Sequence, residues 1–159
     1  MKQMRKASRQ KDEDWALAVF DKAPYVTVSM TRPDGTPYGL PLSLVRDGRT
    51  FYFHCAHEGE KLDCLAANPA VSLSAVSRCI PAYEEEKQNF TEHYRSATAI
   101  GRARPVTDDA EKIHALRLLC QRFLPAHMAR FDAAVDRSLA RTAVIRIDLT
   151  APAVGKAKP

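Results

Sequence analysis

Residues 50–63 read TFYFHCAHEGEKLD, and they contain the change from strand to helix that decides the fold. The first six letters place phenylalanine, phenylalanine and cysteine at every second position, which is typical of a strand with one buried face. A turn with Gly59 follows, and then leucines at helical spacing continue to Asn68 before a proline. The stretch therefore predicts a strand over 50–56 and a helix over 58–68.

Two more strands precede this stretch. Residues 25–31 alternate apolar and small polar side chains, and residues 37–46 follow after the turn RPDGT, in which proline and glycine favour a chain reversal. Pro41 within the second strand indicates an edge, a bulge or a place where the backbone faces a ligand. Asp47-Gly48 is a strong hairpin signal before the third strand. The first three strands therefore form an antiparallel meander, and a short helix after Asp12 precedes them.

The remainder of the chain adds three strands. We expect strands over 70–76, 94–106 and 142–149, a loop or irregular insertion over 77–93, and two helices between the last two strands, at about 108–121 and 126–139. Gly101 inside the fifth strand predicts a bend or bulge. Six antiparallel strands with a helix inserted after the third favour a small, mainly β barrel with flanking helices.

The net charge of +5 is concentrated at the two ends of the 159-residue chain. Seven of its 24 basic residues lie in the acid-free segments 1–11 and 151–159, so 17 basic residues stand against 19 acidic ones elsewhere. A folded nucleic-acid module gathers its basic residues on one face, so we expect no nucleic-acid partner. We divide the chain into a basic N-terminal tail (1–10), one domain (11–150) and a flexible C-terminal tail (151–159).

Hydropathy and cysteine usage bear on the compartment. No apolar run approaches the roughly 20 residues of a membrane helix, and no apolar segment follows the basic N-terminal residues. The four cysteines are scattered without a C-x-x-C pair, which fits reduced thiols rather than disulfides or a zinc site. We expect a cytoplasmic protein with no membrane partner and no bound metal.

Residues 53–61, FHCAHEGEK, hold the groups best suited to chemistry. Free N–H groups at a helix start bind anions, glycine lets a ligand approach the backbone, and Lys61 adds a positive charge. In the simpler interpretation Lys61 is a solvated helix residue and His54 an ordinary strand residue. Spacing alone favours that simpler interpretation, because one glycine and one lysine form a weak motif.

Four stretches together resemble a known family. They are LPLS at 40–43, the stretch 50–63, LAANP at 65–69 and IGRA at 100–103. These residues look like those of the pyridoxamine-phosphate-oxidase-like split barrels, and within them the nitroimidazole-reductase-like flavin-binding proteins. The resemblance runs from about residue 11 to about residue 150, and its middle motif is the specific part.

The resemblance implies an FMN-binding split barrel that forms a homodimer with FMN at the interface. The strand 40–44 would lie along the isoalloxazine, His54 and Cys55 beside the ribityl–phosphate chain, and Lys61 at the phosphate, while Ser96 would be a polar flavin contact. The residues so assigned to the cofactor are Pro41, Leu42, Ser43, His54, Cys55, Ala56, Gly59, Lys61 and Ser96.

The chain departs from the true oxidases of this family in three ways. Glu60 stands where they have an arginine directly before the lysine, and their phosphate-contacting arginine is replaced near Leu40. Their substrate-phosphate residues have no counterpart in 151–159. We therefore do not expect pyridoxamine phosphate to be the substrate.

The function implied is an FMN-dependent oxidoreductase with NAD(P)H as donor and a small planar acceptor such as a nitroaromatic. The alternatives are a deazaflavin-dependent reductase on the same barrel, or a protein that stores or senses flavin or haem without turnover. His54-Cys55-x-His57 is a poor metal or haem motif, because adjacent strand residues point to opposite faces. No residue outside the flavin contacts has the pattern of an obligatory acid or base, so no catalytic residue is predicted.

Overall fold

The computed structural model describes residues 4–159 as one mixed-length antiparallel sheet with helices on two sides. Seven strands follow one path in the order β3-β2-β6-β7-β8-β5-β4, and β9 pairs with β7 and with β1. The strands are β1 (Gln10–Lys11), β2 (Val26–Thr31), β3 (Pro37–Leu42), β4 (Val45–Asp47), β5 (Thr50–Cys55), β6 (Ala70–Glu84), β7 (Asn89–Pro105), β8 (Ala143–Leu149) and β9 (Val154–Lys158).

Helices begin where the sequence offers capping groups. The α-helices are α1 (Glu13–Lys22), α2 (Glu60–Ala67), α3 (Asp109–Phe123) and α4 (Phe131–Ser138), and the short 3-10 turns are Ala7–Arg9, Glu85–Lys87, Pro125–Arg130 and Leu139–Arg141. Asp12 accepts the Trp15 N–H at 2.9 Å, and Asp108 accepts the Glu111 N–H at 2.8 Å. Each carboxylate satisfies a donor that has no partner within the helix. These caps confirm the helix starts predicted at Asp12 and Asp108.

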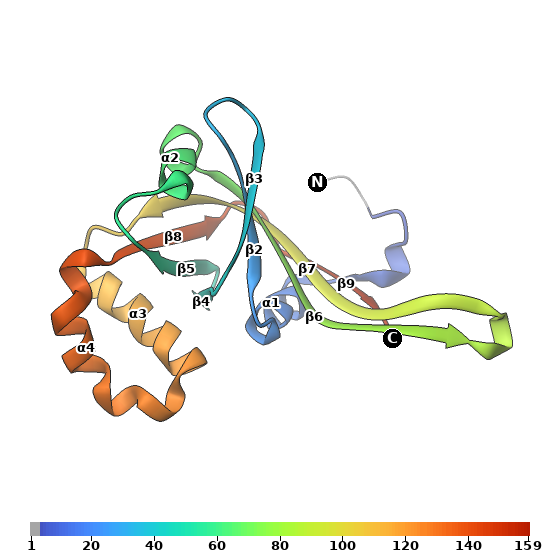
Figure 1. Ribbon diagram of the computed structural model, residues 1–159. Coiled ribbons are helices and arrows are strands. Elements are labelled where there is room, and N and C mark those ends of the chain that lie inside the picture. The colour runs from blue at the N-terminus through green and yellow to red at the C-terminus, as the bar shows by residue number, and fades with distance from the viewer. Residues whose placement is uncertain (1–3) are drawn as a thin grey trace.

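The sheet curves into a barrel that is not closed by hydrogen bonds. β3 and β4 lie at opposite ends of the strand path, and only the two residues Ser43-Leu44 join them along the chain. In Figure 1 the β2–β3 hairpin stands beside β5 and β8, with α2 above the space between them. The fold is therefore the split barrel that the sequence predicted, mainly β with flanking helices.

Two apolar layers hold the barrel together. The main core lies inside it, where α1 residues such as Phe20 meet Phe51 and Phe53, each about 1% exposed. The Phe20 and Phe51 rings meet edge to face with centroids 5.1 Å apart. A second cluster lies between α3, α4 and the other face of β5 and β8, around Tyr52 and Val144. β5 is thus buried on both faces, and its position is strongly fixed.

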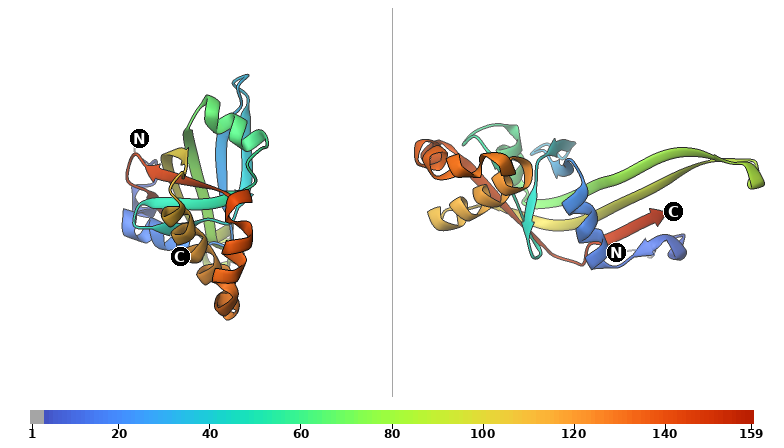
Figure 2. Two further views of the ribbon diagram at one scale, coloured as in Figure 1. Left: turned by 90° about the vertical axis from the view of Figure 1, so that its left-hand side faces the viewer. Right: turned by 90° about the horizontal axis from the view of Figure 1, so that it is seen from below.

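The segment 77–93 is not the predicted loop. β6 continues to Glu84 and β7 starts at Asn89, so the segment is a two-stranded arm that projects from the barrel (Figures 1 and 2). A register shift between Val76 and Arg78 marks where the arm begins. Both faces of the arm meet solvent, so its sequence lacks the alternation that identifies half-buried strands.

The two predicted tails also require correction. Val154–Lys158 form β9, which pairs with β7, and Gln10–Lys11 pair with β9 in turn. The flexible C-terminal tail was therefore wrong for these residues, and the basic N-terminal tail is ordered where it meets β9. The part of that predicted tail at residues 1–3 lies outside the described residues.

Two positions show why the sequence used glycine or proline. A Cβ on Gly101 would lie 2.7 Å from the Asp148 carbonyl oxygen, so glycine permits a close approach of β7 to β8 rather than the predicted bulge. Pro41 lies on β3, an edge strand, which confirms one of the roles expected for it.

Candidate functional site: the split between β3 and β5

The opening of the barrel lies between the end of β3 and the end of β5. Val45 pairs with Tyr52, and this is the last pair of the β4–β5 ladder in that direction. Continuing the register would place Ser43 opposite His54, but no pairing forms there and β5 pairs only with β8. The split is therefore flanked by residues 41–43 on one side and 54–56 on the other, two segments that the sequence assigned to the cofactor.

The two flanking segments differ in which side chains face inward. Leu42 and Cys55 are partly buried and pack against the main core, as Leu40 and Leu62 do. Pro41, Ser43, His54 and Ala56 are exposed along the same segments. The inner wall of the split is therefore apolar, and its polar groups lie at the rim.

The start of α2 covers one end of the split. Gly59 precedes the helix with φ +126°, a conformation that side chains disfavour, and the space where a Cβ would point is open. No side chain caps this helix, so the N–H groups of Glu60 and Lys61 precede its first internal hydrogen bond. These donors and the helix dipole suit an anion.

Lys61 is half-buried and close enough to Cys55 to affect it electrostatically. Burial raises the pKa of the Cys55 thiol, and the positive charge of Lys61 opposes that effect only in part. The thiol therefore stays protonated at neutral pH and has no thiolate character.

Arg32 is a charged group at this end of the split that sequence reasoning missed. Its Nε lies 2.5 Å from Glu60 Oε1, its Nη1 donates to the Pro37 carbonyl at 2.8 Å, and its guanidinium lies 4.7 Å from the Tyr38 ring centroid. The pair neutralises the carboxylate that stands directly before Lys61. No local signal predicts it, because 28 residues separate the partners.

The loop between β5 and α2 is fixed from the side of the helices. His57 Nε2 lies 3.1 Å from the Ala140 carbonyl oxygen, in the turn after α4. His57 therefore points away from His54, and the predicted cofactor residues on either side of it keep their places relative to the sheet.

Ser96 lies apart from the other predicted residues. It is on β7 opposite Val76, and β6 and β2 separate it from β3, a span of about 14 Å at normal strand spacing. Its hydroxyl is 3.4 Å from the Lys156 carbonyl oxygen. Within one chain, the structure brings the segments 41–43, 54–56 and 59–61 together around the split but leaves Ser96 outside.

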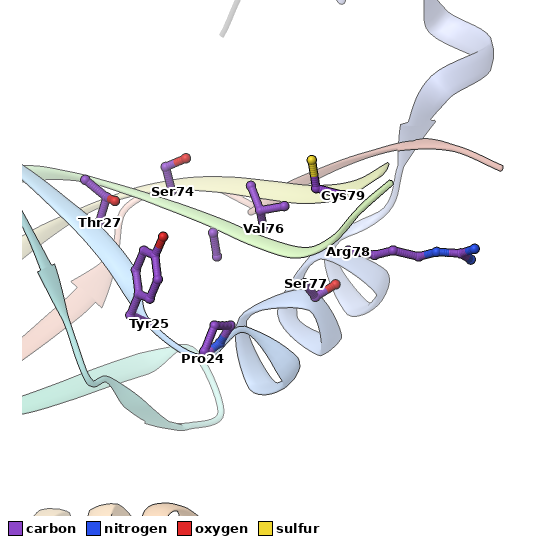
Figure 3. Close-up of a pocket in the computed structure, with 9 residues that line it drawn as sticks. Pro24, Tyr25, Thr27, Ser74, Val76, Ser77, Arg78 and Cys79 are labelled. Atoms are coloured by element: carbon purple, nitrogen blue, oxygen red, sulfur yellow. The ribbon is translucent and has the colours of Figure 1, made fainter. Parts of the chain in front are cut away.

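A shallow hollow of about 360 Å³ lies on the outer face of the sheet, between Ser96 and the split. Tyr25, Thr27, Ser74 and Val76 line it and come from β2, β6 and the residues next to them (Figure 3). Tyr25 is 56% exposed and Val76 48% exposed, which is unusual for side chains of this size on a sheet. This outer face is the part of the barrel with apolar side chains available to a partner.

Two further properties of residues 4–159 bear on the type of site. No three or more histidine, cysteine, aspartate or glutamate side chains gather where they could hold a metal ion. No helix in the same part of the chain is long and apolar enough to span a bilayer.

An unclosed antiparallel barrel with a helix start over its opening defines the class of split-barrel proteins. Residues 12–154 match the family model for pyridoxamine 5'-phosphate oxidase, so the chain belongs to that family. No protein with a curated description matches the sequence.

Three solved structures share the fold. One is assigned to 5-nitroimidazole antibiotic resistance in Bacteroides thetaiotaomicron, with 21% identity, a TM-score of 0.75 and coverage of 92% of this chain and 87% of that one. A flavocytochrome from Azotobacter vinelandii has 23% identity, a TM-score of 0.80 and coverage of 99% and 72%. An FAD- and haem-binding protein from Mycobacterium smegmatis has 25% identity, a TM-score of 0.77 and coverage of 94% and 73%.

Proposed function

We propose that this protein binds FMN in the split, with the phosphate at the start of α2, and uses it as an oxidoreductase. The observation that carries the proposal is the position of Gly59 and Lys61 over an apolar opening. A phosphate dianion needs donors or cations when it leaves water. Lys61 and the free N–H groups at the helix start offer both.

The charges around this helix start fit a phosphate. Glu60 by itself would repel an anion, but its carboxylate is already paired with Arg32. The apolar side chains of Leu42 and Cys55 suit the flat face of an isoalloxazine, which is large and weakly polar. The residues present therefore match the two chemically different ends of FMN.

The redox chemistry belongs to the flavin, which accepts and donates hydride or single electrons when bound. The chain would bind it, orient its ring along residues 40–44 and exclude water from one face. The protonated Cys55 thiol gives no sign of nucleophilic catalysis. We propose NADH or NADPH as donor and a small planar acceptor, such as a nitroaromatic, in keeping with the relative assigned to nitroimidazole resistance. Pyridoxamine phosphate is not expected as the substrate, since no substrate-phosphate residues are recognised in 151–159.

We also propose a homodimer in the cytoplasm, with the site completed between subunits. The exposed apolar side chains of the outer face and arm, which include Tyr25, Val76 and Phe90, support an interface. Ser96 would then reach a flavin held by the other copy. Light scattering should give about twice 17.7 kDa, and a stable monomer that still holds FMN would contradict this part of the proposal.

An absorbance spectrum of the freshly purified protein tests the cofactor, because flavin, deazaflavin and haem differ plainly. Haem is the second candidate, since two of the similar structures carry haem in their descriptions and His54 is exposed at the rim of the split. Anaerobic NADH or NADPH should then bleach the bound flavin, and air or a nitroaromatic should restore it. A flavin that neither donor reduces would favour storage or sensing instead.

A further inference from the structure

A second hollow lies at the base of the arm, far along the chain from the split. It has a volume of about 370 Å³ and is formed by α1, β6, β7, β9 and the residues before α1. Its cationic lining residues are Lys11, Arg78, Arg95 and Lys158, and its lining contains no acidic residue. The basic ends of the chain, which the sequence suggested were loose, meet here because β1 pairs with β9.

Two arginines face each other across neighbouring strands in this hollow. Arg78 pairs with Arg95 in the β6–β7 register, and both side chains are exposed. Like charges directly opposite each other destabilise a sheet. Neither arginine makes an ion pair or a side-chain hydrogen bond within residues 4–159, and Lys11 makes none either. An anion between the two guanidiniums would remove this repulsion.

The register shift in β6 determines where Arg78 points. An extra residue between Val76 and Arg78 re-aims the side chains that follow it. Figure 3 shows Arg78 extended away from Tyr25 and Thr27, so it does not serve the hollow on the outer face. The bulge thereby places a second cation beside Arg95.

The nearby acidic groups already have partners. Glu84 lies 3.0 Å from Lys158 and 3.2 Å from Lys87, so Lys158 is largely compensated. Asp12, next to Lys11, accepts the backbone N–H of Trp15. The uncompensated cations of the hollow are therefore Lys11, Arg78 and Arg95.

Trp15 forms an aromatic wall of the same hollow. Its ring lies against Gly155, where any Cβ would overlap it, so the ring is held in place from one side. A nucleotide base stacks well on such a ring. Trp15 is also the one tryptophan of the chain, so its fluorescence reports on this hollow alone.

We propose that this hollow binds the diphosphate of a nucleotide between Arg78 and Arg95, with the base against Trp15. Its volume suits a small ligand rather than a polymer, because nucleic-acid sites gather cations along an open face. Guanidinium pairs match phosphate oxygens in geometry as well as charge. The ligand is either a free nucleoside diphosphate or the same group within a dinucleotide such as NADH. The inference does not depend on flavin binding at the split.

The test is a titration of the full-length protein with ADP, followed by Trp15 fluorescence and by calorimetry. We expect saturable ADP binding in the wild type and at least tenfold weaker binding in Arg78→Gln and in Arg95→Gln. Arg102→Gln is the matched control, because Arg102 is an exposed arginine of the same strand outside the hollow, and it should bind as the wild type does. Adenosine, which has no phosphate, should bind at least tenfold more weakly than ADP.

NADH distinguishes the two sources of the diphosphate. Tighter binding of NADH than of ADP at this site would identify a dinucleotide, and equal or weaker binding a free nucleotide; either supports the site. Absence of saturable ADP binding, equal loss in Arg102→Gln, or adenosine binding as tightly as ADP would overturn the proposal. A single-stranded oligonucleotide that binds here when ADP does not would also overturn it, in favour of a nucleic-acid surface. Failure of FMN to bind at the split would leave these results unchanged.

Discussion

The two ends of the sheet treat charge in opposite ways. At the split, the helix start carries Glu60 and Lys61, and Arg32 neutralises Glu60 at 2.5 Å. At the base of the arm, Arg78 and Arg95 face each other without an acidic partner in the described chain. The split thus offers one cation above an apolar opening, whereas the arm offers a cluster of cations in an exposed hollow. The first suits one phosphate on a mainly apolar ligand, and the second a more highly charged ligand.

Two tyrosines record the same difference. Burial, and then a 3.0 Å hydrogen bond to the Glu111 carboxylate, raise the pKa of Tyr52 on β5 to about 12. Burial alone would raise the pKa of Tyr94 on β7 too, but hydrogen bonds with Arg9 and Lys156 lower it on balance. The barrel end is therefore an environment that resists a negative charge on its tyrosine, and the arm end one that favours it.

Phe53→Ala should produce the largest effect, because its ring is about 1% exposed in the core beneath the split. We expect a loss of about 3–5 kcal/mol in the free energy of unfolding, from lost burial and the cavity left behind. Urea unfolding measures it. Phe90→Ala is the matched control, since that ring is 87% exposed on the arm, and should change subunit stability by less than about 0.5 kcal/mol. Similar losses in both variants would contradict the contrast between barrel and arm.

Lys61→Ala should weaken FMN binding by about 1.5–3 kcal/mol, the value of a charge-assisted hydrogen bond. Riboflavin, which lacks the phosphate, should bind the variant almost as it binds the wild type. Lys87→Ala removes an equally flexible cation from the tip of the arm and should leave both ligands unaffected. Equal losses for FMN and riboflavin would mean that Lys61 acts through the fold rather than on the phosphate.

Tyr52→Phe and Tyr94→Phe should respond to alkaline pH with opposite signs. At neutral pH, Tyr52→Phe loses a hydrogen bond worth about 0.5–1.5 kcal/mol. In the unfolded chain a tyrosine ionises near a pKa of about 10, below the folded value of about 12 for Tyr52. The advantage of the wild type over Tyr52→Phe should therefore shrink as pH rises through this interval.

For Tyr94 the folded pKa is the lower one, so ionisation favours the folded state. The advantage of the wild type over Tyr94→Phe should grow as pH approaches about 10. Urea unfolding of the three proteins across the alkaline range measures both trends. A parallel response of the two variants would contradict the electrostatic difference between the regions.

Deletion of residues 1–9 should have the smallest effect on the flavin. It removes the Arg9 contact to Tyr94, 3.4 Å long, but no group near the split. We expect FMN affinity to change by less than about 0.5 kcal/mol, as for most changes away from a site. A large loss in a folded protein would show that the N-terminus belongs to the flavin site.

The sequence predicted the split end well because its signals are local. The change from strand to helix around Gly59, and the caps at Asp12 and Asp108, depend on residues a few positions apart. The order of the central strands follows from short turns, such as the one at Gly48. The apolar alternation of β5 then fixed which side chains enter the core.

The arm and the ends of the chain could not be predicted, because their order comes from distant partners. β9 exists through pairing with β7 and β1, more than 50 residues away in each case. Residues 77–93 form two strands without a buried face, so no period-2 pattern marks them. The Arg32–Glu60 pair is likewise a tertiary contact, and the sequence indicated only that Glu60 needed compensation.

The central claim is that the phosphate of FMN lies at the start of α2, and NMR of the backbone amides tests it most directly. Spectra of the protein with FMN and with riboflavin differ only through the phosphate. We predict that the largest differences between the two complexes fall on the amides of Gly59, Glu60 and Lys61, with little change at Arg78 and Arg95. Largest differences at Arg78 and Arg95, with residues 59–61 unchanged, would contradict the account and move the flavin phosphate to the base of the arm.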